Sequence, residues 1–210
     1  MLCCPLCTHR AERYVEDRRR AYFHCPCCDL VFADPASHLE AAGQKEEYDR
    51  HENDPADCRY RRFLNRLAAP LLDRLSPGMQ GLDYGCGPGP TLSLMLEEAG
   101  MSMTDFDPFY RPNTDALNRQ YDFVTCTEVV EHFSRPAHDW GQLTALLRPG
   151  SWLGIMTKLV ISRERFADWH YKADPTHVVF YSPATFTWLG MQFGLTVERV
   201  DRDVLILQKT

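Results

Sequence analysis

Two glutamates and a histidine follow directly on an apolar run in the middle of the chain. The stretch TEVVEH comes after Phe123–Cys126, which has the composition of a buried strand. If a helix begins at its first residue, Thr127, then Glu128, Glu131 and His132 stand at i, i+3 and i+4 and share one face. Such a group can hold a divalent cation such as Mg²⁺ or Mn²⁺, or transfer a proton. A solvated helix start is the simpler interpretation, so the rest of the chain must decide.

A second set of chemically capable residues lies at the N-terminus, because six of the nine cysteines fall within the segment 1–28. Cys4 and Cys7 form one C-x2-C pair, and Cys25 and Cys28 form another, with the segment 8–24 between them. This spacing is typical of a structural zinc site. The hairpin between the pairs is too small for a core of its own, so zinc would supply about 10 kcal/mol of folding free energy. The spacing therefore predicts a zinc ribbon over residues 1–33.

The neighbours of these four cysteines leave two questions open. Cys3 and Cys27 are spare thiols that could replace a predicted ligand. The run Arg18–Arg20 falls at the tip of the predicted hairpin, where it could touch phosphate, although a solvated turn is the more common role. We favour a structural or substrate-docking role for the ribbon.

The composition of the 210-residue chain limits its class. Hydrophobic residues make up 44% and charged residues 25%, which is typical of a globular protein. The formal net charge of −6 provides no overall basic field for nucleic acid or an anionic membrane. No apolar run approaches the length of a membrane-spanning helix, and nine cysteines without an export signal are typical of a reducing compartment. We expect a cytoplasmic protein with no membrane association, made of one domain and an attachment.

The remaining chain divides into a polar linker and an alternation of elements. Residues 34–56 are polar and broken by prolines, which predicts a linker with a short helix. Apolar residues recur every three or four positions from Tyr60 to Leu75, which predicts an amphipathic helix. Beyond it, the pattern predicts strands at 81–84, 101–106, 123–126, 152–157, 195–200 and 204–208, and helices at 91–99, 137–147 and 183–193. This alternation predicts an α/β fold over residues 57–210, with a mostly parallel sheet that ends in an antiparallel hairpin.

A glycine-rich loop follows the first of these strands. The sequence LDYGCGPGP places Gly85 and Gly87 where a strand-to-helix loop can contact a nucleotide-like ligand. A nicotinamide-dependent oxidoreductase would need a third glycine where this chain has Pro90, whose ring would obstruct the close approach of helix and strand. The loop instead resembles, glycine for glycine, the first motif of the class I S-adenosylmethionine-dependent methyltransferases.

The resemblance to this family covers most of residues 57–210. Asp107 in TDFDPF stands at the end of the second strand, where the family has an acidic residue that accepts hydrogen bonds from the ribose hydroxyls. YDFVTCTEVVEHF is similar to the family's fourth strand and the loop after it, LLRPG to the turn before the fifth strand, and the final hairpin to the reversed last strand. The resemblance implies a Rossmann-like sheet and an S-adenosylmethionine site formed by Asp83, Gly85, Cys86, Gly87, Asp107, Pro108 and Thr127.

One departure from the family pattern concerns the third strand. Only the short stretch 108–120 separates Asp107 from Tyr121, which is too little chain for the helix and strand that the family has there. We therefore expect a truncated third-strand unit, a shortened or missing edge strand and a more open adenine pocket.

The resemblance also gives TEVVEH a specific interpretation. Its E-x-x-E-H pattern is similar to that of two metal-using branches of the family, one acting on the terminal ribose hydroxyl of small RNAs and the other on catechol-like polyprenyl quinone precursors. In both, a metal lowers the pKa of the substrate oxygen. Glu128, Glu131 and His132 would then be ligands, with His177 as the fourth. Without a metal, His132 or His177 would be the general base.

These observations predict an S-adenosylmethionine-dependent methyltransferase with an N-terminal zinc ribbon. The expected methyl acceptor is an oxygen of a small molecule. An RNA hydroxyl or base is the second choice, because the chain is acidic. An interaction module on an inactive methyltransferase fold is the non-enzymatic alternative, and it predicts no affinity for the methyl donor. The sequence leaves the oligomeric state open.

Overall fold

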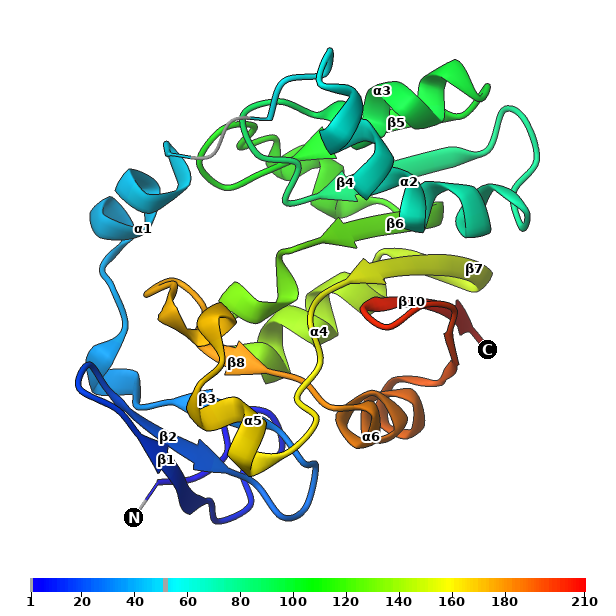
Figure 1. Cartoon of the computed structure of the whole chain (residues 1–210). Helices are drawn as coiled ribbons and strands as arrows, with labels where there is room; N and C mark the ends of the chain where they lie inside the picture. Colours follow the sequence, from blue (N-terminus) through cyan, green and yellow to red (C-terminus); the bar gives the residue numbers. More distant parts are fainter. Residues whose placement is uncertain (1, 51–52) are drawn as a thin grey trace.

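Two β-sheets organise the structure, a computed structural model that describes residues 2–50 and 53–210 (Figure 1). The larger sheet has the strand order β5-β4-β6-β7-β10-β9, and the smaller has the order β1-β2-β3-β8. The larger sheet consists of β4 (Gln80–Tyr84), β5 (Ser102–Phe106), β6 (Tyr121–Thr127), β7 (Leu147–Met156), β9 (Leu195–Arg199) and β10 (Val204–Lys209). The smaller consists of β1 (Glu12–Glu16), β2 (Ala21–His24), β3 (Val31–Ala33) and β8 (Val179–Phe180).

The larger sheet is mostly parallel, as the alternation of elements predicts. β5, β4, β6 and β7 run parallel to one another, whereas β10 is antiparallel to both β7 and β9. The C-terminal hairpin therefore inserts one reversed strand, which confirms the predicted arrangement.

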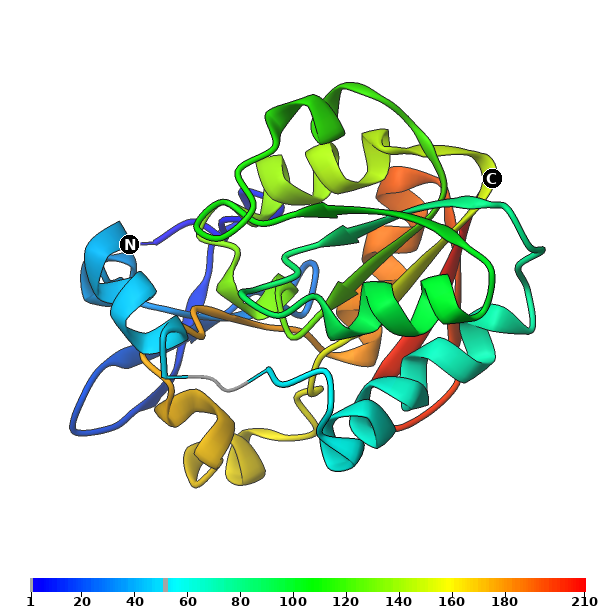
Figure 2. The ribbon, with the colours of Figure 1, turned by 90° about the horizontal axis from the view of Figure 1, so that it is seen from above.

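Helices cover both faces of this sheet. α2 (Cys58–Leu72) and α3 (Thr91–Glu98) lie on one face, and α4 (Pro136–Ala145) and α6 (Pro183–Phe193) lie on the other (Figure 2). Because successive residues of a strand point to opposite faces, Phe123 of β6 packs with Leu67 of α2, while Val124 joins the core around Trp140 of α4. Within residues 2–50 and 53–210, no helix is long and apolar enough to cross a membrane.

The third-strand unit is truncated, as expected from the short spacing after Asp107. Between β5 and β6 the chain forms only a short 3-10 helix, η2 (Thr114–Asn118). β5 is consequently the last strand on its side of the sheet, and β4 is its neighbour.

The smaller sheet joins the N-terminal ribbon to the body of the chain. β1, β2 and β3 come from the ribbon, but β3 pairs antiparallel with β8, in register Val31↔Phe180 and Phe32↔Val179. β8 belongs to the segment between β7 and α6, which also contains α5 (Arg163–Ala167) and the 3-10 helix η4 (His170–Ala173). The ribbon and this segment are therefore parts of one sheet.

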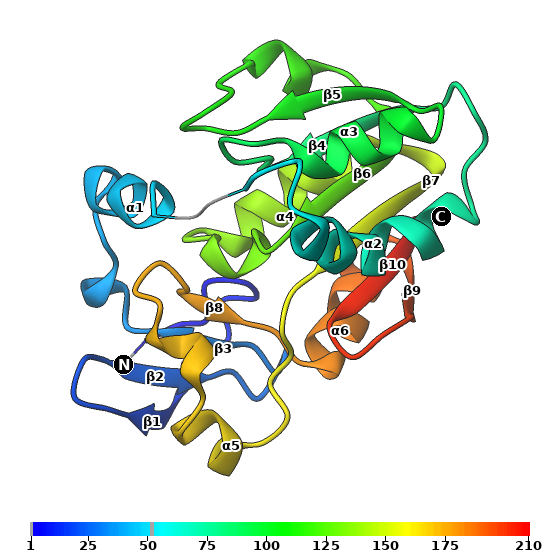
Figure 3. The same ribbon diagram turned by 45° about the horizontal axis from the view of Figure 1, so that its top comes forward.

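The described part of the linker lies at the carboxyl ends of the parallel strands (Figure 3). It contains η1 (Pro35–Ser37) and the predicted short helix, α1 (Ala41–Tyr48), which lies beyond these strand ends on the side of the smaller sheet (Figure 3). The predicted linker 34–56 also includes His51 and Glu52, which lie outside the described residues.

No α-helix begins at Thr127 in the described structure, so the condition under which Glu128, Glu131 and His132 would share one helix face is not met. Thr127 is the last residue of β6, and Glu128 has a positive φ of 51°. Only a 3-10 turn, η3 (Val130–His132), follows.

Candidate functional site

A pocket of about 780 Å³ opens where the parallel strands β4, β5 and β6 end. Neighbouring parallel strands deliver their following loops to the same edge of a sheet, which is where ligands bind in folds of this type. Nine predicted site residues line the pocket: Gly85, Cys86, Gly87, Asp107, Pro108, Thr127, Glu128, His132 and His177. The structure therefore brings together loops that lie far apart in the sequence.

The glycine loop has the backbone conformation that its sequence suggests. Gly85 and Gly87 have φ values of 82° and 65°, in the region that side chains disfavour. A Cβ atom on Gly85 would lie 2.5 Å from Val129, and one on Gly89 would lie 2.2 Å from the carbonyl oxygen of Asn53. Glycine is needed at these positions for conformation or space, and at Gly85 and Gly87 it exposes backbone to a ligand in the pocket.

Asp107 organises the loops around it through backbone amides. Its Oδ2 accepts a hydrogen bond from Gly87 N at 3.0 Å, and its Oδ1 accepts from Phe109 N and Tyr110 N at 2.8 and 3.0 Å. A carboxylate has about four acceptor positions, so these three bonds leave about one for a ligand hydroxyl. Asp107 lines the pocket and can hold a ligand while it fixes the glycine loop.

Asp83, which the resemblance places in the cofactor site, is not among the described residues that line the pocket. Its side chain is buried and accepts a hydrogen bond from Thr125 Oγ1 at 2.7 Å. Burial raises the pKa of the Asp83 carboxyl to about 7, and the negative charges of Asp105 and Asp107 act in the same direction. Asp83 thus supports the strand beneath the loop.

Thr127 does line the pocket, at the end of β6. Its buried Oγ1 has no hydrogen-bond partner among the described residues. A buried hydroxyl that makes no hydrogen bond has lost its hydration without a compensating interaction. This oxygen is therefore suited to bind a ligand.

Glu128 turns the chain at the end of β6. Its backbone N donates to Met156 O at 2.8 Å, which extends the ladder to β7, while its positive φ directs the chain away from the strand. A non-glycine residue in this conformation stores strain of roughly 1 kcal/mol or more, which is common at functional sites. Burial raises the pKa of the Glu128 carboxyl to about 7, although Lys158 opposes the shift. Near neutral pH this group can therefore accept and release a proton.

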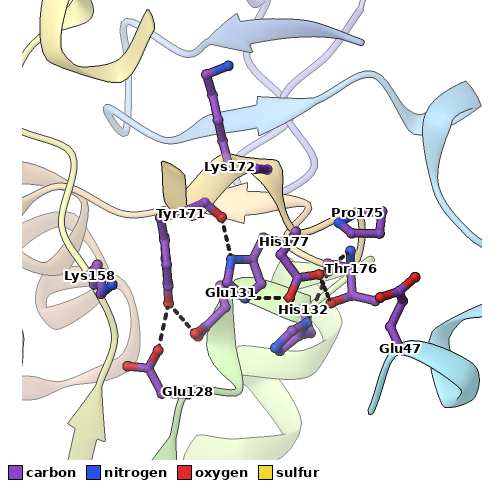
Figure 4. A network of polar contacts seen from close by, with 12 residues as sticks. Glu47, Glu128, Glu131, His132, Lys158, Tyr171, Lys172, Pro175, Thr176 and His177 are labelled. Carbon is purple, nitrogen blue, oxygen red and sulfur yellow. Dashed lines mark hydrogen bonds and ion pairs between the residues drawn. The ribbon is translucent and has the colours of Figure 1, made fainter. Parts of the chain in front are cut away.

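Tyr171 of η4 connects the two glutamates of TEVVEH (Figure 4). Its hydroxyl donates a close hydrogen bond to Glu131 Oε1 and also lies 3.3 Å from Glu128 Oε2. Glu131 is 0% exposed, and its Oε2 has no hydrogen-bond partner within the described chain. Burial, followed by the charge of Glu128, raises the pKa of Glu131 well above its ordinary value. Of the pair, Glu128 is the one that lines the pocket.

Two histidines lie beside this pair. His132 Nδ1 is 3.0 Å from Thr176 O, and His177 Nδ1 is 2.7 Å from Tyr171 O. A carbonyl can only accept, so each ring carries a proton on Nδ1, and Nε2 of His177 lies 3.8 Å from Asp174 Oδ2. The two rings meet edge to face with centroids 4.8 Å apart. Rings held in this way by backbone carbonyls can act as metal ligands or general bases when Nε2 is unprotonated.

The predicted metal ligands are gathered only in part. One ligand atom each from Glu131, His132 and His177 lie within 4.8 Å of one another, but Glu128 is not a member of this group in the described chain. The ligand atoms of the group Glu131, His132 and His177 come from two imidazoles and one carboxylate. This set suits Mn²⁺ better than Mg²⁺, because Mg²⁺ prefers oxygen ligands.

The four predicted zinc ligands come together in the ribbon. Cys4 Sγ lies 3.5 Å from Cys28 Sγ, Cys7 Sγ lies 3.4 Å from Cys25 Sγ, and all four sulfurs lie within 4.8 Å of one another. These spacings approach the edge of a tetrahedral zinc–thiolate site, about 3.8 Å for Zn–S bonds of about 2.3 Å. The spare thiols Cys3 and Cys27 are exposed and lie outside the group.

The two cysteine pairs form matching turns. Thr8 N donates to Cys4 O, and at the corresponding place Asp29 N donates to Cys25 O, at 2.9 and 2.8 Å. Thr8 and Asp29 both have positive φ, 64° and 58°. The backbone therefore presents each pair of sulfurs in the same way toward a common centre.

Tyr48 and Tyr171 are not among the site residues that the sequence predicts. The ring of Tyr48, at the end of α1, contacts the rings of Phe109 and His132 at centroid distances of 5.6 and 5.2 Å. Tyr171 lies in η4, a 3-10 helix too short for a hydrophobic periodicity to mark a buried residue. The only available signal was the concentration of aromatic and histidine residues between β7 and α6.

Several known methyltransferases have sequences similar to this chain. A family model described as a methyltransferase domain matches residues 28–200. The ubiquinone biosynthesis O-methyltransferase of Aeromonas salmonicida (strain A449) is 28% identical over 140 residues, which cover 62% of this chain and 59% of that protein. The enzyme of the same name from Bordetella avium (strain 197N) is 29% identical over 122 residues, which cover 45% and 50%. The chain thus spans between half and three fifths of these two relatives.

Two solved structures have a similar fold. Magnesium protoporphyrin IX methyltransferase of Synechocystis PCC 6803, with bound S-adenosylhomocysteine, gives a TM-score of 0.53 at 16% identity and covers 81% of this chain and 95% of that one. The 1,6-didemethyltoxoflavin-N1-methyltransferase of Burkholderia thailandensis gives 0.52 at 17% identity and covers 95% and 100%. This likeness, with the strand order above, confirms the predicted Rossmann-like α/β fold.

Proposed function

The chain belongs to the methyltransferase domain family, and on that basis we propose that it transfers a methyl group from S-adenosylmethionine to an oxygen atom of a small molecule. One observation carries the proposal. A single pocket is lined both by the glycine loop with Asp107 and by Glu128, His132 and His177, so a donor and an acceptor can occupy one cavity. A cavity of about 780 Å³ is in the upper part of the range for small-molecule sites.

The donor site fits the methyl donor in three respects. Gly85 and Gly87 open the backbone to a ligand, Asp107 keeps an acceptor position for a ribose hydroxyl, and Thr127 has a hydroxyl without a partner among the described residues. When bound, S-adenosylmethionine supplies an electrophilic methyl group. The chain's own contribution is to orient the donor and to exclude water from it.

On the acceptor side, Glu128 is the residue suited to take a proton from a hydroxyl. It faces the pocket, and its pKa of about 7 allows it to be ionised at neutral pH. The names of the two ubiquinone-pathway relatives support an oxygen acceptor. The net charge of −6 provides no general attraction for RNA, so a small aromatic hydroxyl is preferred to an RNA acceptor.

We further propose two metal sites. Glu131, His132 and His177 would hold a divalent cation, with Mn²⁺ preferred, because their ligand atoms converge and Glu131 Oε2 lacks a hydrogen-bond partner in the described chain. Calorimetric titration with Mn²⁺ tests this site: heat that disappears in Glu131→Gln but persists in Glu128→Gln supports it, and no heat from the wild type removes it. Cys4, Cys7, Cys25 and Cys28 would hold a structural Zn²⁺.

Calorimetric titration of S-adenosylhomocysteine into the zinc-loaded protein tests the main proposal. We expect micromolar binding in the wild type and at least about a tenfold loss in Asp107→Ala, because a charge-assisted hydrogen bond and the acceptor that anchors Gly87 both disappear. Methyl transfer to 3,4-dihydroxybenzoate, a simple catechol, then tests the oxygen acceptor. No binding by the wild type would overturn the proposal and favour an interaction module.

A further inference from the structure

Arg20 directly precedes β2 in the ribbon and is buried, although the sequence places it at a solvated hairpin tip. Its relative exposure is 8%. Nη2 donates to the carbonyl oxygens of Lys172 and Asp174, both at 2.8 Å, and Nη1 donates to Pro175 O at 3.2 Å. Nε donates to the hydroxyl of Tyr22 at 2.9 Å. A guanidinium buried against carbonyl oxygens has exchanged its hydration for these four bonds.

Arg19 and Asp17 also contact residues 172–175. Arg19 Nη1 donates to Ala173 O at 2.6 Å, so each of the four carbonyls from Lys172 to Pro175 accepts a bond from Arg19 or Arg20. Lys172 Nζ makes a close ion pair with Asp17, which caps the turn before β2 through Arg19 N and Arg20 N. These contacts form what we call the arginine clamp: Asp17, Arg19 and Arg20 on residues 172–175.

The clamped segment lies between two residues of the acceptor side of the pocket. Tyr171 precedes it and bridges Glu128 and Glu131, whereas His177 follows it and lines the pocket (Figure 4). The carbonyl of Tyr171 accepts from His177 Nδ1 across the segment at 2.7 Å. The positions of the tyrosine hydroxyl and of the imidazole therefore both depend on the path of residues 172–175.

A second connection fixes the far end of the segment to the ribbon. Val178 N donates to Glu131 O, and Val178 O accepts from Ala33 N in β3, both at 2.9 Å. One residue thus links the ribbon sheet to the TEVVEH turn through backbone hydrogen bonds. The ribbon holds the segment at Arg20 on one side and at Ala33 on the other.

We propose that Arg20 is a positioning residue, through which the ribbon sets the geometry of Tyr171 and His177 on the acceptor side of the pocket. It acts on the pocket through residues 172–175. The role in methyl transfer rests on the proposed function, whereas the mechanical role of the clamp does not. A lysine at position 20 cannot fully replace Arg20, because one ammonium group does not reach three carbonyl oxygens as the planar guanidinium does.

Hydrogen–deuterium exchange of the full-length protein tests the clamp without any methyl acceptor. In Arg20→Ala, we expect the amides of Thr176, His177 and Val178 to exchange at least about tenfold faster, because several buried charge-assisted bonds are lost. The amides of β6 and the dissociation constant for S-adenosylhomocysteine should stay within about twofold, because the glycine loop is anchored by Asp107 and not by the clamp. Arg13→Ala is the matched control, since Arg13 lies on the same hairpin and pairs with the exposed Glu16.

A second measurement separates positioning from general stability. If wild type methylates 3,4-dihydroxybenzoate, Arg20→Ala should lower kcat at least about tenfold with unchanged donor affinity, and Arg20→Lys should recover only part of it. Unchanged local exchange, or equal acceleration throughout the larger sheet, would overturn the proposal. Should Arg20→Ala fail to fold, the same comparison on Arg20→Lys decides. Failure of wild type to bind S-adenosylhomocysteine would remove the proposed function but leave the exchange result valid.

Discussion

Replacing Asp83 with asparagine should stabilise the protein at pH 8 and leave methyl-donor binding unchanged. Asp83 is 4% exposed beneath the glycine loop, where Thr125 donates to its Oδ1 at 2.7 Å. Asparagine has the same shape and can keep this bond through its carbonyl oxygen. Burial raises the pKa of the Asp83 carboxyl to about 7 in the folded protein, whereas the unfolded chain keeps the ordinary pKa of 3.8.

The sign and size of the effect follow from proton binding. Between pH 5 and pH 7 the folded protein holds the proton that the unfolded chain has lost, so this group's contribution to stability falls as the pH rises and levels off above pH 7. At about 1.36 kcal/mol per pH unit, wild type loses about 3 kcal/mol over this interval that the neutral amide does not lose. A domain of this size shifts its melting temperature by about 2–4 °C per kcal/mol, so the variant should gain about 6–12 °C relative to wild type between pH 5 and pH 8.

Urea and thermal unfolding followed by circular dichroism at pH 5, 6, 7 and 8 measure this difference. Asp115→Asn is the control, because Asp115 is an exposed carboxylate in η2. Other titrating groups cancel in the comparison of variant with wild type. Parallel pH profiles for wild type and Asp83→Asn would refute the reasoning. Loss of S-adenosylhomocysteine binding in Asp83→Asn would instead return Asp83 to the cofactor site that the sequence suggests.

Three further predictions concern the pocket and the ribbon. Gly89→Ala should weaken S-adenosylhomocysteine binding at least about tenfold in calorimetry, because its Cβ would overlap a carbonyl oxygen at 2.2 Å, whereas Gly141→Ala, with open space around it, should not. Tyr171→Phe should lower the unfolding free energy by about 1–3 kcal/mol in urea titrations, since a fully buried carboxyl loses its hydroxyl donor; an unchanged midpoint contradicts this. Cys7→Ser should abolish zinc binding measured by metal analysis, whereas Cys3→Ser should retain about one zinc per chain.

The large sheet could be predicted from the sequence because its signals are local. Each parallel strand is an apolar run bounded by turn residues, and each helix has its own periodicity, so neither requires knowledge of the partner element. The missing third strand was equally local, because the stretch 108–120 is too short to form a helix and a strand. The glycine loop and Asp107 could also be predicted from local sequence, since both lie at the ends of predicted strands.

The parts that could not be predicted depend on contacts between distant segments. β8 has only two residues and is defined by its pairing with β3, so no pattern in its own sequence predicts a strand there. Glu128 adopts a positive φ that glutamate does not prefer, and the residues after it form a 3-10 turn where the sequence allowed an α-helix. Arg20 was interpreted as solvated because the carbonyls that bury it come from a segment far along the chain, between β7 and α6.

The proposed donor and acceptor sides of the pocket differ in the same way: one depends on local sequence signals, and the other on contacts between distant segments. The proposed donor side is formed by the loops that directly follow β4 and β5 and by Thr127 at the end of β6, so short continuous sequence motifs identify it. The acceptor side instead combines the turn after β6, the segment between β7 and α6, and the ribbon that holds this segment through Arg20 and Ala33. Changes in the ribbon should therefore alter the choice and rate of acceptor methylation while donor affinity stays constant. A ribbon variant that changed donor affinity first would show that the two sides are not built independently.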